Sequence, residues 1–349
     1  MIELLRELVE LESPTGDTGR MRDRTAAELR ELGGTITPEG EHVRADFAGE
    51  GPPLLLLGHL DTVWTRGTLA TLPWRVEDGR AYGPGVHDMK GGLVVMLEAI
   101  RRARATRALR VFLTADEEIG SPTAREPLAR AADGAAAAFV CEPPTEAGDL
   151  KTARKGLGRF VLRVTGRAAH AGKPLEGASA IEELARLTLR LHALTDRRRG
   201  VSVNVGVVEG GTRENVVAAE ASARLDVRVP SVAERDRLDA LLHSLGTETP
   251  GTEVTLEGLW TRPPLERSPG AALLFEQARR HGRALGLDLH ESSAAGGSDG
   301  NLVGALGVPV LDGLGAEGSG AHAIDEHVVV DSLPVRAELL AALLREPGL

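Results

Sequence analysis

The chain has 349 residues, and its 41 basic and 51 acidic side chains give a formal net charge of −10. A nucleic-acid-binding surface has to be basic in order to displace counterions, so this balance argues against a general nucleic-acid binder. The single cysteine, Cys141, excludes an intrachain disulfide and a cysteine-rich zinc cluster. The acidic excess is typical of a soluble surface, but it also suits carboxylates that hold a metal, and composition leaves both interpretations open.

The N-terminal segment MIELLRELVELESPTG has apolar residues at helical spacing with acidic residues between them. A secretory signal needs a basic start and an unbroken apolar run, and this segment has neither. No stretch approaches the roughly 20 apolar residues that a transmembrane helix requires. We therefore expect a cytoplasmic protein with no membrane partner and no nucleic-acid partner.

The chain begins with two predicted helices, over 2–11 and 18–32, and the second ends at a Gly-Gly pair typical of a helix C-terminus. Short apolar runs then alternate with helical segments. Continuous apolar strands that alternate with helices predict an α/β fold, with a mixed, mostly parallel sheet sandwiched by helices. The apolar runs expected to form strands of this sheet are 54–57, 109–113, 135–140 and 308–311.

The pattern changes after Lys151. Four segments alternate apolar and polar residues like half-exposed strands, and two amphipathic helices lie among them. Their order is β-α-β-β-α-β, the arrangement of an open-faced α+β sandwich. The strands are 159–165, 201–208, 221–229 and 253–259, and the helices are 178–194 and 233–245. We expect this domain, 155–263, to be inserted between two parts of the larger α/β domain, 1–154 and 264–349.

Histidine or acidic residues follow the end of one predicted strand after another. The carboxyl ends of parallel strands meet at one edge of a sheet, so we expect these side chains to lie close together. Each alone would suit a helix cap or a solvated loop residue, but the joint pattern favours a shared site. The candidates are His59, Asp61, Asp88, Glu117, Glu118, Glu142 and His322.

Two histidines and three carboxylates form the ligand set of a two-zinc hydrolytic site. Asp88 is the candidate bridging ligand, because a carboxylate between two cations about 3.5–4 Å apart offsets their repulsion. Asp61 follows His59 by two residues and can orient its imidazole. In the adjacent pair Glu117 and Glu118, one carboxylate can bind metal while the other accepts a proton from water.

Five segments, in this order, closely resemble the M20 family of metallopeptidases: GHLDTV (58–63), YGPGVHDMKGG (82–92), TADEEIGS (114–121), CEP (141–143) and GAHAIDEHV (320–328). A sixth, GRAAHAGKPLEGASAI (166–181), is similar to the inserted lid or dimerisation domain of that family. The resemblance covers nearly the whole chain. The stretch from GHLDTV through YGPG is most similar to the glutamate carboxypeptidase branch of carboxypeptidase G2-like enzymes.

The resemblance implies a role for each candidate. It implies two Zn²⁺ ions per subunit, or Co²⁺ or Mn²⁺ in the same places, with Asp88 as the bridging ligand. One ion would be completed by His59 and Glu142, and the other by Glu118 and His322. Glu117 would be the general base and Asp61 would orient His59. The implied reaction is cleavage of an amide bond by metal-activated water, which releases a C-terminal amino acid, such as glutamate, from a peptide or N-acyl conjugate.

The inserted domain carries further residues that match the family's motifs. His170 would reach across a homodimer formed through 155–263 and donate to the developing oxyanion, whereas by itself it reads as an exposed histidine in a Gly-rich turn. Asn215 and Arg228 match positions that support the same site. Arg262 would hold a substrate carboxylate, because a guanidinium binds carboxylate with two hydrogen bonds. Two further residues are candidates for substrate binding. Gly297 matches a Gly-rich turn that lines the pocket in the family, and Lys151 is either a substrate contact or a surface lysine.

Two other functions compete with the carboxypeptidase hypothesis. An N-acyl-amino-acid deacylase, such as an acetylornithine deacetylase or a succinyl-diaminopimelate desuccinylase, uses the same metal site. A non-catalytic binding homologue would lack the base or a ligand, and here all of them are present. Of the remaining residues, His42 is expected to be exposed, and Cys141 is expected to be a buried small side chain and not a nucleophile.

Overall fold

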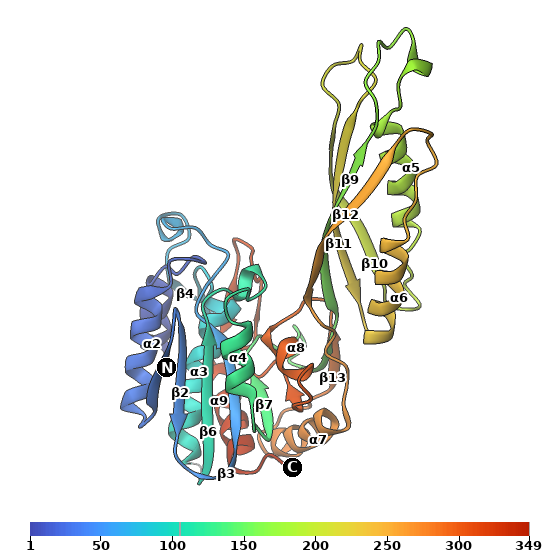
Figure 1. Cartoon of the computed structure of the whole chain (residues 1–349). Coiled ribbons are helices and arrows are strands. Elements are labelled where there is room, and N and C mark those ends of the chain that lie inside the picture. Colours follow the sequence, from blue (N-terminus) through green and yellow to red (C-terminus); the bar gives the residue numbers. More distant parts are fainter. Residues whose placement is uncertain (105, 349) are drawn as a thin grey trace. The chain divides into compact units, whose positions relative to one another are not determined.

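The computed structural model describes residues 1–104 and 106–348 (Figure 1). The chain divides into two compact units. The larger unit consists of Met1–Ala153, Glu266–Ala294 and Ser298–Leu349. The smaller unit consists of Arg154–Leu265 and Ala295–Gly297.

A six-stranded sheet forms the centre of the larger unit. Its neighbouring strands are, in order, β1 (Thr35–Glu39), β2 (His42–Phe47), β6 (Arg107–Thr114), β3 (Glu50–His59), β7 (Ala137–Val140) and β14 (Val310–Leu311). The last four of these strands run parallel to one another, whereas β2 is antiparallel to β6 and β1 is antiparallel to β2. The predicted fold class, α/β with a mixed and mostly parallel sheet, is therefore confirmed.

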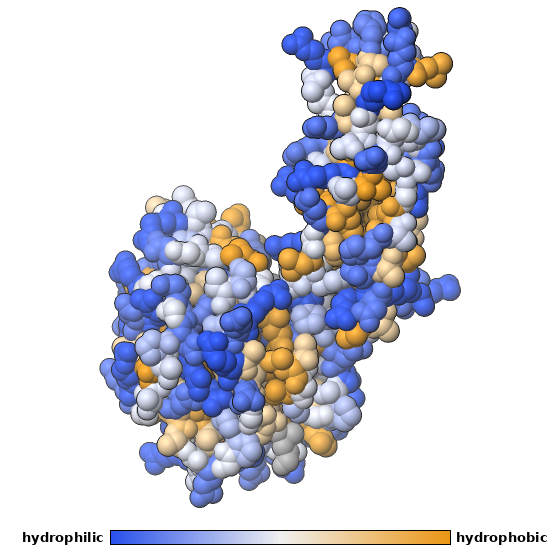
Figure 2. All heavy atoms as spheres, in the orientation of Figure 1, coloured by the Kyte–Doolittle hydropathy of each residue, from blue (hydrophilic) through white to orange (hydrophobic). Residues whose placement is uncertain are grey.

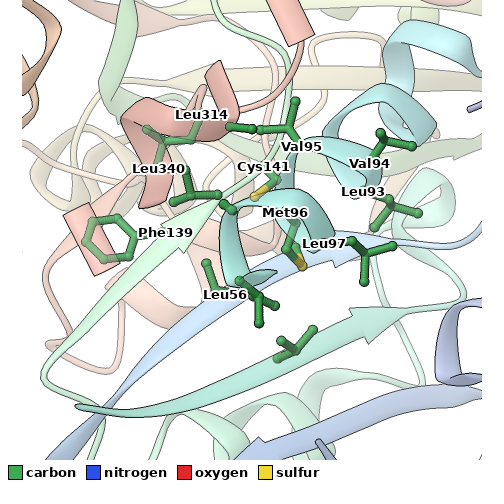
Figure 3. Close-up of a cluster of buried hydrophobic side chains, with 14 of the residues drawn as sticks. Leu56, Leu93, Val94, Val95, Met96, Leu97, Phe139, Cys141, Leu314 and Leu340 are labelled. Atoms are coloured by element: carbon green, nitrogen blue, oxygen red, sulfur yellow. The ribbon is translucent and has the colours of Figure 1, made fainter. Parts of the chain in front are cut away.

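Helices cover both faces of this sheet, and for that reason its central strands are apolar on both sides (Figure 1). Leu54 and Leu56 of β3 point into the main core, and Leu55 and Leu57 are equally buried on the opposite side. Figure 3 shows Leu56 and Phe139 beside the side chains of α3 in that core. The helices that supply the core are α1 (Ile2–Glu10), α2 (Gly19–Glu31), α3 (Gly91–Ala103), α7 (Pro269–Ala284) and α9 (Ser332–Arg345), and α4 (Arg125–Ala132) and α8 (Asp299–Gly304) cover the opposite face.

A second, four-stranded sheet brings two distant loops together. Its order is β15 (Gly318–Ser319), β16 (His327–Val329), β5 (Arg80–Tyr82) and β4 (Arg75–Glu77). Strand β16 pairs antiparallel with β5, so the chain that leaves β5 lies beside the chain that enters β16. Strands β8 (Leu150–Arg154) and β13 (Glu291–Ala294) form a separate two-stranded sheet. Short helical turns occur at Thr68–Ala70, Val86–Lys90, Glu117–Ile119 and Pro174–Glu176.

The smaller unit is a four-stranded antiparallel sheet with two helices. The strand order is β10 (Ser202–Gly210), β11 (Glu220–Val229), β9 (Gly156–Thr165) and β12 (Glu253–Arg262). Helices α5 (Ala180–His192) and α6 (Val232–His243) pack on the sheet and bury a separate apolar core. Each begins at a serine, Ser179 or Ser231, whose hydroxyl accepts a main-chain N–H of the first turn. Figure 2 shows hydrophobic residues of this unit gathered where strands and helices meet.

The helices in the described part of the chain are short or carry charged residues. None of them combines the length and the apolar character that such a span needs.

The start of α3 is packed directly against the end of β7, which gives a test of this packing. A Cβ atom on Gly92 would lie 1.9 Å from the carbonyl oxygen of Cys141. We expect Gly92→Ala to lower the free energy of unfolding, measured by urea denaturation, by about 1–3 kcal/mol, because the backbone at Cys141, after the end of β7, has to move. The matched control is Gly19→Ala at the start of α2, where a Cβ atom would meet no atom of the described residues within 4 Å, apart from its chain neighbours and the backbone of its own helix. Equal stability of the two variants would contradict the close packing.

Candidate active site

The carboxyl ends of three adjacent parallel strands form the floor of the site. His59 is the last residue of β3, Glu117 and Glu118 follow β6, and Glu142 follows β7. Asp88 lies in the loop that precedes α3. His322 lies between β15 and β16, with its φ at 65°, a left-handed conformation that is uncommon for a residue with a side chain. The pairing of β5 with β16 places the loops of Asp88 and His322 side by side.

The Asp88 carboxylate lies between the two histidines. Its Oδ1 is 3.0 Å from Nε2 of His59, and its Oδ2 is 3.2 Å from Nε2 of His322. Each histidine also contacts a glutamate: His59 Nε2 is 3.5 Å from Glu142 Oε1, and His322 Nε2 is 3.3 Å from Glu118 Oε2. The structure thus brings all five predicted ligands together as two groups that share Asp88.

These separations fit a pair of metal ions that take nitrogen and oxygen ligands. Four ligands placed tetrahedrally at about 2.0–2.1 Å from Zn²⁺ lie about 3.3 Å from one another. One ligand atom each of His59, Asp88 and Glu118 lies within 4.8 Å of the other two. Oε1 of Glu118 is buried and has no hydrogen-bond partner among the described residues. A buried carboxylate oxygen that lacks a donor is the type of atom that a cation would satisfy.

The electrostatics of the site favour positive charge. Burial alone would lower the pKa of His59, but hydrogen bonds with the carboxylates of Asp61 and Asp88 outweigh it and raise that pKa well above its ordinary value. Contacts with Asp88 and Glu118 raise the pKa of His322 to about 10. Burial opposes ionisation of Asp88, yet both histidines together lower its pKa. Asp88 therefore stays ionised between the two histidines.

Asp61 holds the loop that carries the glutamate pair. Its carboxylate accepts hydrogen bonds from the main-chain N–H groups of Glu117 (3.1 Å) and Glu118 (3.2 Å) and from the hydroxyl of Thr15 (2.7 Å). Nδ1 of His59 lies 2.8 Å from the main-chain oxygen of Asp61 and 3.4 Å from its Oδ1. Asp61 therefore contacts Nδ1, the ring nitrogen that does not face Asp88, through both its carbonyl and its carboxylate.

The two glutamates after β6 differ in their surroundings. Glu118 faces His322. Glu117, the residue before Glu118, is half-buried and is the first residue of the short helical turn. Asp116 is outside the ligand groups, because its Oδ2 accepts hydrogen bonds from the amide and hydroxyl of Thr123 at 2.7 Å. Acidic residues of this segment therefore have different partners: Asp116 contacts Thr123, and Glu118 contacts His322.

Sequence reasoning missed two contributors to this edge of the sheet. Thr15 lies between the two predicted N-terminal helices, 2–11 and 18–32, where no site residue was expected. His42 was expected to be exposed, and this was wrong: it is 5 % exposed, and its Nδ1 accepts the main-chain N–H of Ala115 at 3.1 Å. The reason is tertiary, because β2 pairs with β6 and so places His42 against Phe112 at the end of that strand.

The predicted residues of the inserted domain lie in the smaller unit. His170 and Asn215 are exposed on neighbouring loops, which are joined by a hydrogen bond from the N–H of Ala171 to the carbonyl of Asn215 at 3.0 Å. The N–H of Gly172 donates to Nδ1 of His170 (3.0 Å), so a neutral ring carries its proton on Nε2. Arg228 is half-buried and donates to Asp226 at 2.8 Å.

Arg262 packs against the Gly-rich turn of the smaller unit. It is 3 % exposed, and a Cβ atom on Gly297 would lie 2.8 Å from its Cδ. Arg154 donates to the carbonyls of Gly296 and Gly297 at 3.2 and 3.3 Å. The turn therefore requires glycine at 297, because the Arg262 side chain occupies the space of a side chain there.

Two residues of the larger unit adjoin Glu142 in sequence or space. Nζ of Lys151 donates to the carbonyl of Pro143 at 2.6 Å, so this half-buried side chain lies beside the loop of Glu142. Cys141 is fully buried, and burial raises the pKa of its thiol. A thiol that stays protonated is a poor nucleophile, as the sequence analysis expected.

Comparison with known proteins assigns the chain to a family. Residues 55–346 match Peptidase family M20/M25/M40. The chain belongs to this family. Among curated M20 relatives, carboxypeptidase G2 of Pseudomonas sp. (strain RS-16) is 31 % identical over 377 residues, covering 100 % of this chain and 89 % of the relative. Succinyl-diaminopimelate desuccinylase of Gluconacetobacter diazotrophicus is 30 % identical and covers 98 % and 96 % of the two chains.

Solved structures agree with the M20 fold. A tripeptidase from Staphylococcus aureus subsp. aureus Mu50 matches with a TM-score of 0.84 at 23 % identity, covering 99 % of this chain and 97 % of that chain. At this level of identity the match shows the fold alone. Together with the family match, it identifies the protein as an M20 hydrolase of the peptidase and amidohydrolase type.

Proposed function

We propose that this M20 hydrolase holds two zinc ions per subunit, or Co²⁺ or Mn²⁺, and releases a C-terminal amino acid such as glutamate from a small peptide or N-acyl conjugate. One observation carries the proposal: the Asp88 carboxylate lies between two groups, each made of one histidine and one glutamate. His59 and Glu142 would hold one ion, and Glu118 and His322 the other. When bound, such ions lower the pKa of water and polarise the scissile carbonyl.

Glu117 is the proposed general base. It lies three residues after the end of β6 and directly before the proposed ligand Glu118, and its main-chain N–H donates to Asp61. Its carboxylate accepts the proton of the attacking water and then delivers that proton to the leaving amine. His170 of a partner subunit would donate a hydrogen bond to the oxyanion, supported by Asn215.

The substrate class rests on basic residues and on the relatives. Arg262, Arg228 and Lys151 are proposed to bind the carboxylates of an acidic substrate. Gly297 is proposed to line the substrate pocket. The similarity to carboxypeptidase G2, which covers the full length of this chain, favours release of the C-terminal amino acid of the substrate. The similarity to succinyl-diaminopimelate desuccinylase favours the second candidate, an N-acyl-amino-acid deacylase of the acetylornithine deacetylase or desuccinylase type.

The catalytic role of Glu117 can be separated from metal binding. We expect Glu117→Ala to lower kcat by about 10²–10⁴-fold, because proton transfer to a positioned base is lost, while the metal content by atomic emission stays unchanged. Glu126→Ala, an exposed glutamate on α4, is the control and should keep full activity. Unchanged function of Glu117→Ala would favour the non-catalytic binding homologue.

A substrate panel distinguishes the two hydrolytic candidates. We expect N-acyl-glutamates and glutamate-terminated dipeptides to give a higher kcat/KM than N-acetylornithine or N-succinyl-diaminopimelate. Arg262→Ala should raise KM for the glutamate substrates more than it lowers kcat, because it removes carboxylate binding. Cleavage restricted to acetylated basic amino acids would reject the carboxypeptidase proposal.

The proposal includes a homodimer through the smaller unit. Strand β10 is an edge of its sheet and pairs with another strand, β11, on one side, a position that favours pairing with another chain. The neighbouring surface is apolar: Leu189 and Ile181 of α5 are 74 % and 47 % exposed, and Val208 of β10 is 57 % exposed. An exposed apolar patch beside an open strand edge suits a second copy of this chain.

Light scattering and subunit mixing test the dimer. We expect a mass of twice 36.8 kDa, and a monomer of low activity for Leu189→Glu, because a charge would be buried at the contact. When inactive His170→Ala and Glu117→Ala proteins are mixed, sites shared between subunits predict partial recovery of turnover. An active wild-type monomer at assay concentration, or no recovery in exchanged mixtures, would contradict the shared site.

A further inference from the structure

Glu326 lies four residues after His322 in the loop that enters β16, and its carboxylate is 3 % exposed. Four N–H groups point at its two oxygens. Oε2 accepts the indole N–H of Trp64 at 2.8 Å and the main-chain N–H of Gly85 at 2.9 Å. Oε1 accepts the main-chain N–H groups of His87 and Asp88, both at 2.9 Å. One buried carboxylate thus connects three separate segments of the larger unit.

The segment that Glu326 holds is the one that carries the proposed bridging ligand. Asp88 and Met89 depart from helical dihedral angles, so this stretch does not form the regular backbone hydrogen bonds of a helix. Buried main-chain N–H groups need acceptors, and at Gly85, His87 and Asp88 the acceptor is Glu326. The hydrogen bond at the amide of Asp88 fixes the backbone directly behind the carboxylate that faces both histidines.

The geometry points to a positioning role and not to a metal-ligand or base role. Each oxygen of Glu326 already accepts two N–H groups, and these four bonds occupy the lone-pair positions of a carboxylate. We propose that Glu326 is a positioning residue that holds Asp88 between His59 and His322 before any cation binds. This inference rests on the proposed function, because it takes Asp88 as the bridging ligand.

Glu326→Gln is the sharpest variant, since glutamine keeps the shape but replaces one acceptor oxygen with an NH₂ group. Whichever way the amide is turned, that group faces two N–H donors. We expect the affinity for Zn²⁺ alone, measured by chelator competition, to fall about tenfold or more, because a partner that orients a ligand is lost. Affinity equal to that of the wild type would overturn the proposal.

The matched control is Glu183→Gln. Glu183 is also fully buried, and its carboxylate accepts the main-chain N–H groups of Glu248 and Thr249 in the smaller unit. The control loses the same kind of acceptor, so it should lose stability but keep its Zn²⁺ affinity. If the two variants lost affinity equally, the effect would be general destabilisation and the positioning role would be rejected.

A second measurement needs no variant. In the metal-free wild-type protein, amide hydrogen exchange over 85–88 should already be slow, because Glu326 holds these N–H groups without a cation. Fast exchange there that slows only when Zn²⁺ is added would show that the cation, and not Glu326, orders the loop. Exchange therefore decides the question even if Glu326→Gln fails to fold.

Asp88→Asn separates this inference from the proposed function. If Asp88→Asn loses Zn²⁺ and Glu326→Gln does not, the metal site stands and the role of Glu326 is rejected. If the wild-type protein binds no Zn²⁺, Co²⁺ or Mn²⁺, the proposed function is rejected, and the positioning role falls with it.

Discussion

Carboxylates crowd one edge of the central sheet, and their mutual repulsion is the constraint on which the surrounding loops depend. The structure divides them by partner. Asp61 and Glu326 accept main-chain N–H groups and so hold backbone in place. Asp88, Glu118 and Glu142 instead face the Nε2 atoms of His59 and His322, on the opposite side of the His59 ring from Asp61. The first group builds the loops, and the second group is left with the negative charge that a cation would neutralise.

This division also explains why the net charge of −10 says little about partners. Part of the acidic excess lies at the site, where Asp61 and Glu326 accept N–H groups and where neighbouring carboxylates raise the pKa values of His59 and His322. Basic residues with proposed substrate roles, such as Arg262 and Lys151, are buried or half-buried and hold fixed positions. The charge that matters for recognition is therefore set by a few placed side chains and not by the total.

The sequence was sufficient where a residue acts through its place on an element. His59 ends a strand, and Glu118 and Glu142 follow strands, whose apolar runs are clear in the sequence. Because the carboxyl ends of parallel strands converge, the sequence predicts that these three residues lie close together. It was insufficient where a residue acts on distant backbone. Trp64 and Glu326 are 262 residues apart, and the burial of His42 depends on the pairing of β2 with β6. No local pattern marks such contacts, because the partners lie far apart in the sequence and most of them are main-chain groups that every residue carries.

The same distinction separates the proposed metal ligands of the site from the residue proposed to position them, Glu326. A ligand can be replaced only by another group that binds a cation, so its identity is visible as a motif. A framework residue such as Glu326 needs only to be an acceptor of the right length at the right place, and in GAHAIDEHV it reads as one more acidic residue of a polar loop. The short sheet that pairs β5 with β16 converts this loop residue into the buried acceptor for a segment more than 230 residues away. Long-range strand pairing thus fixes where the loops of the site lie, while the side chains at the strand ends supply the groups proposed to bind metal.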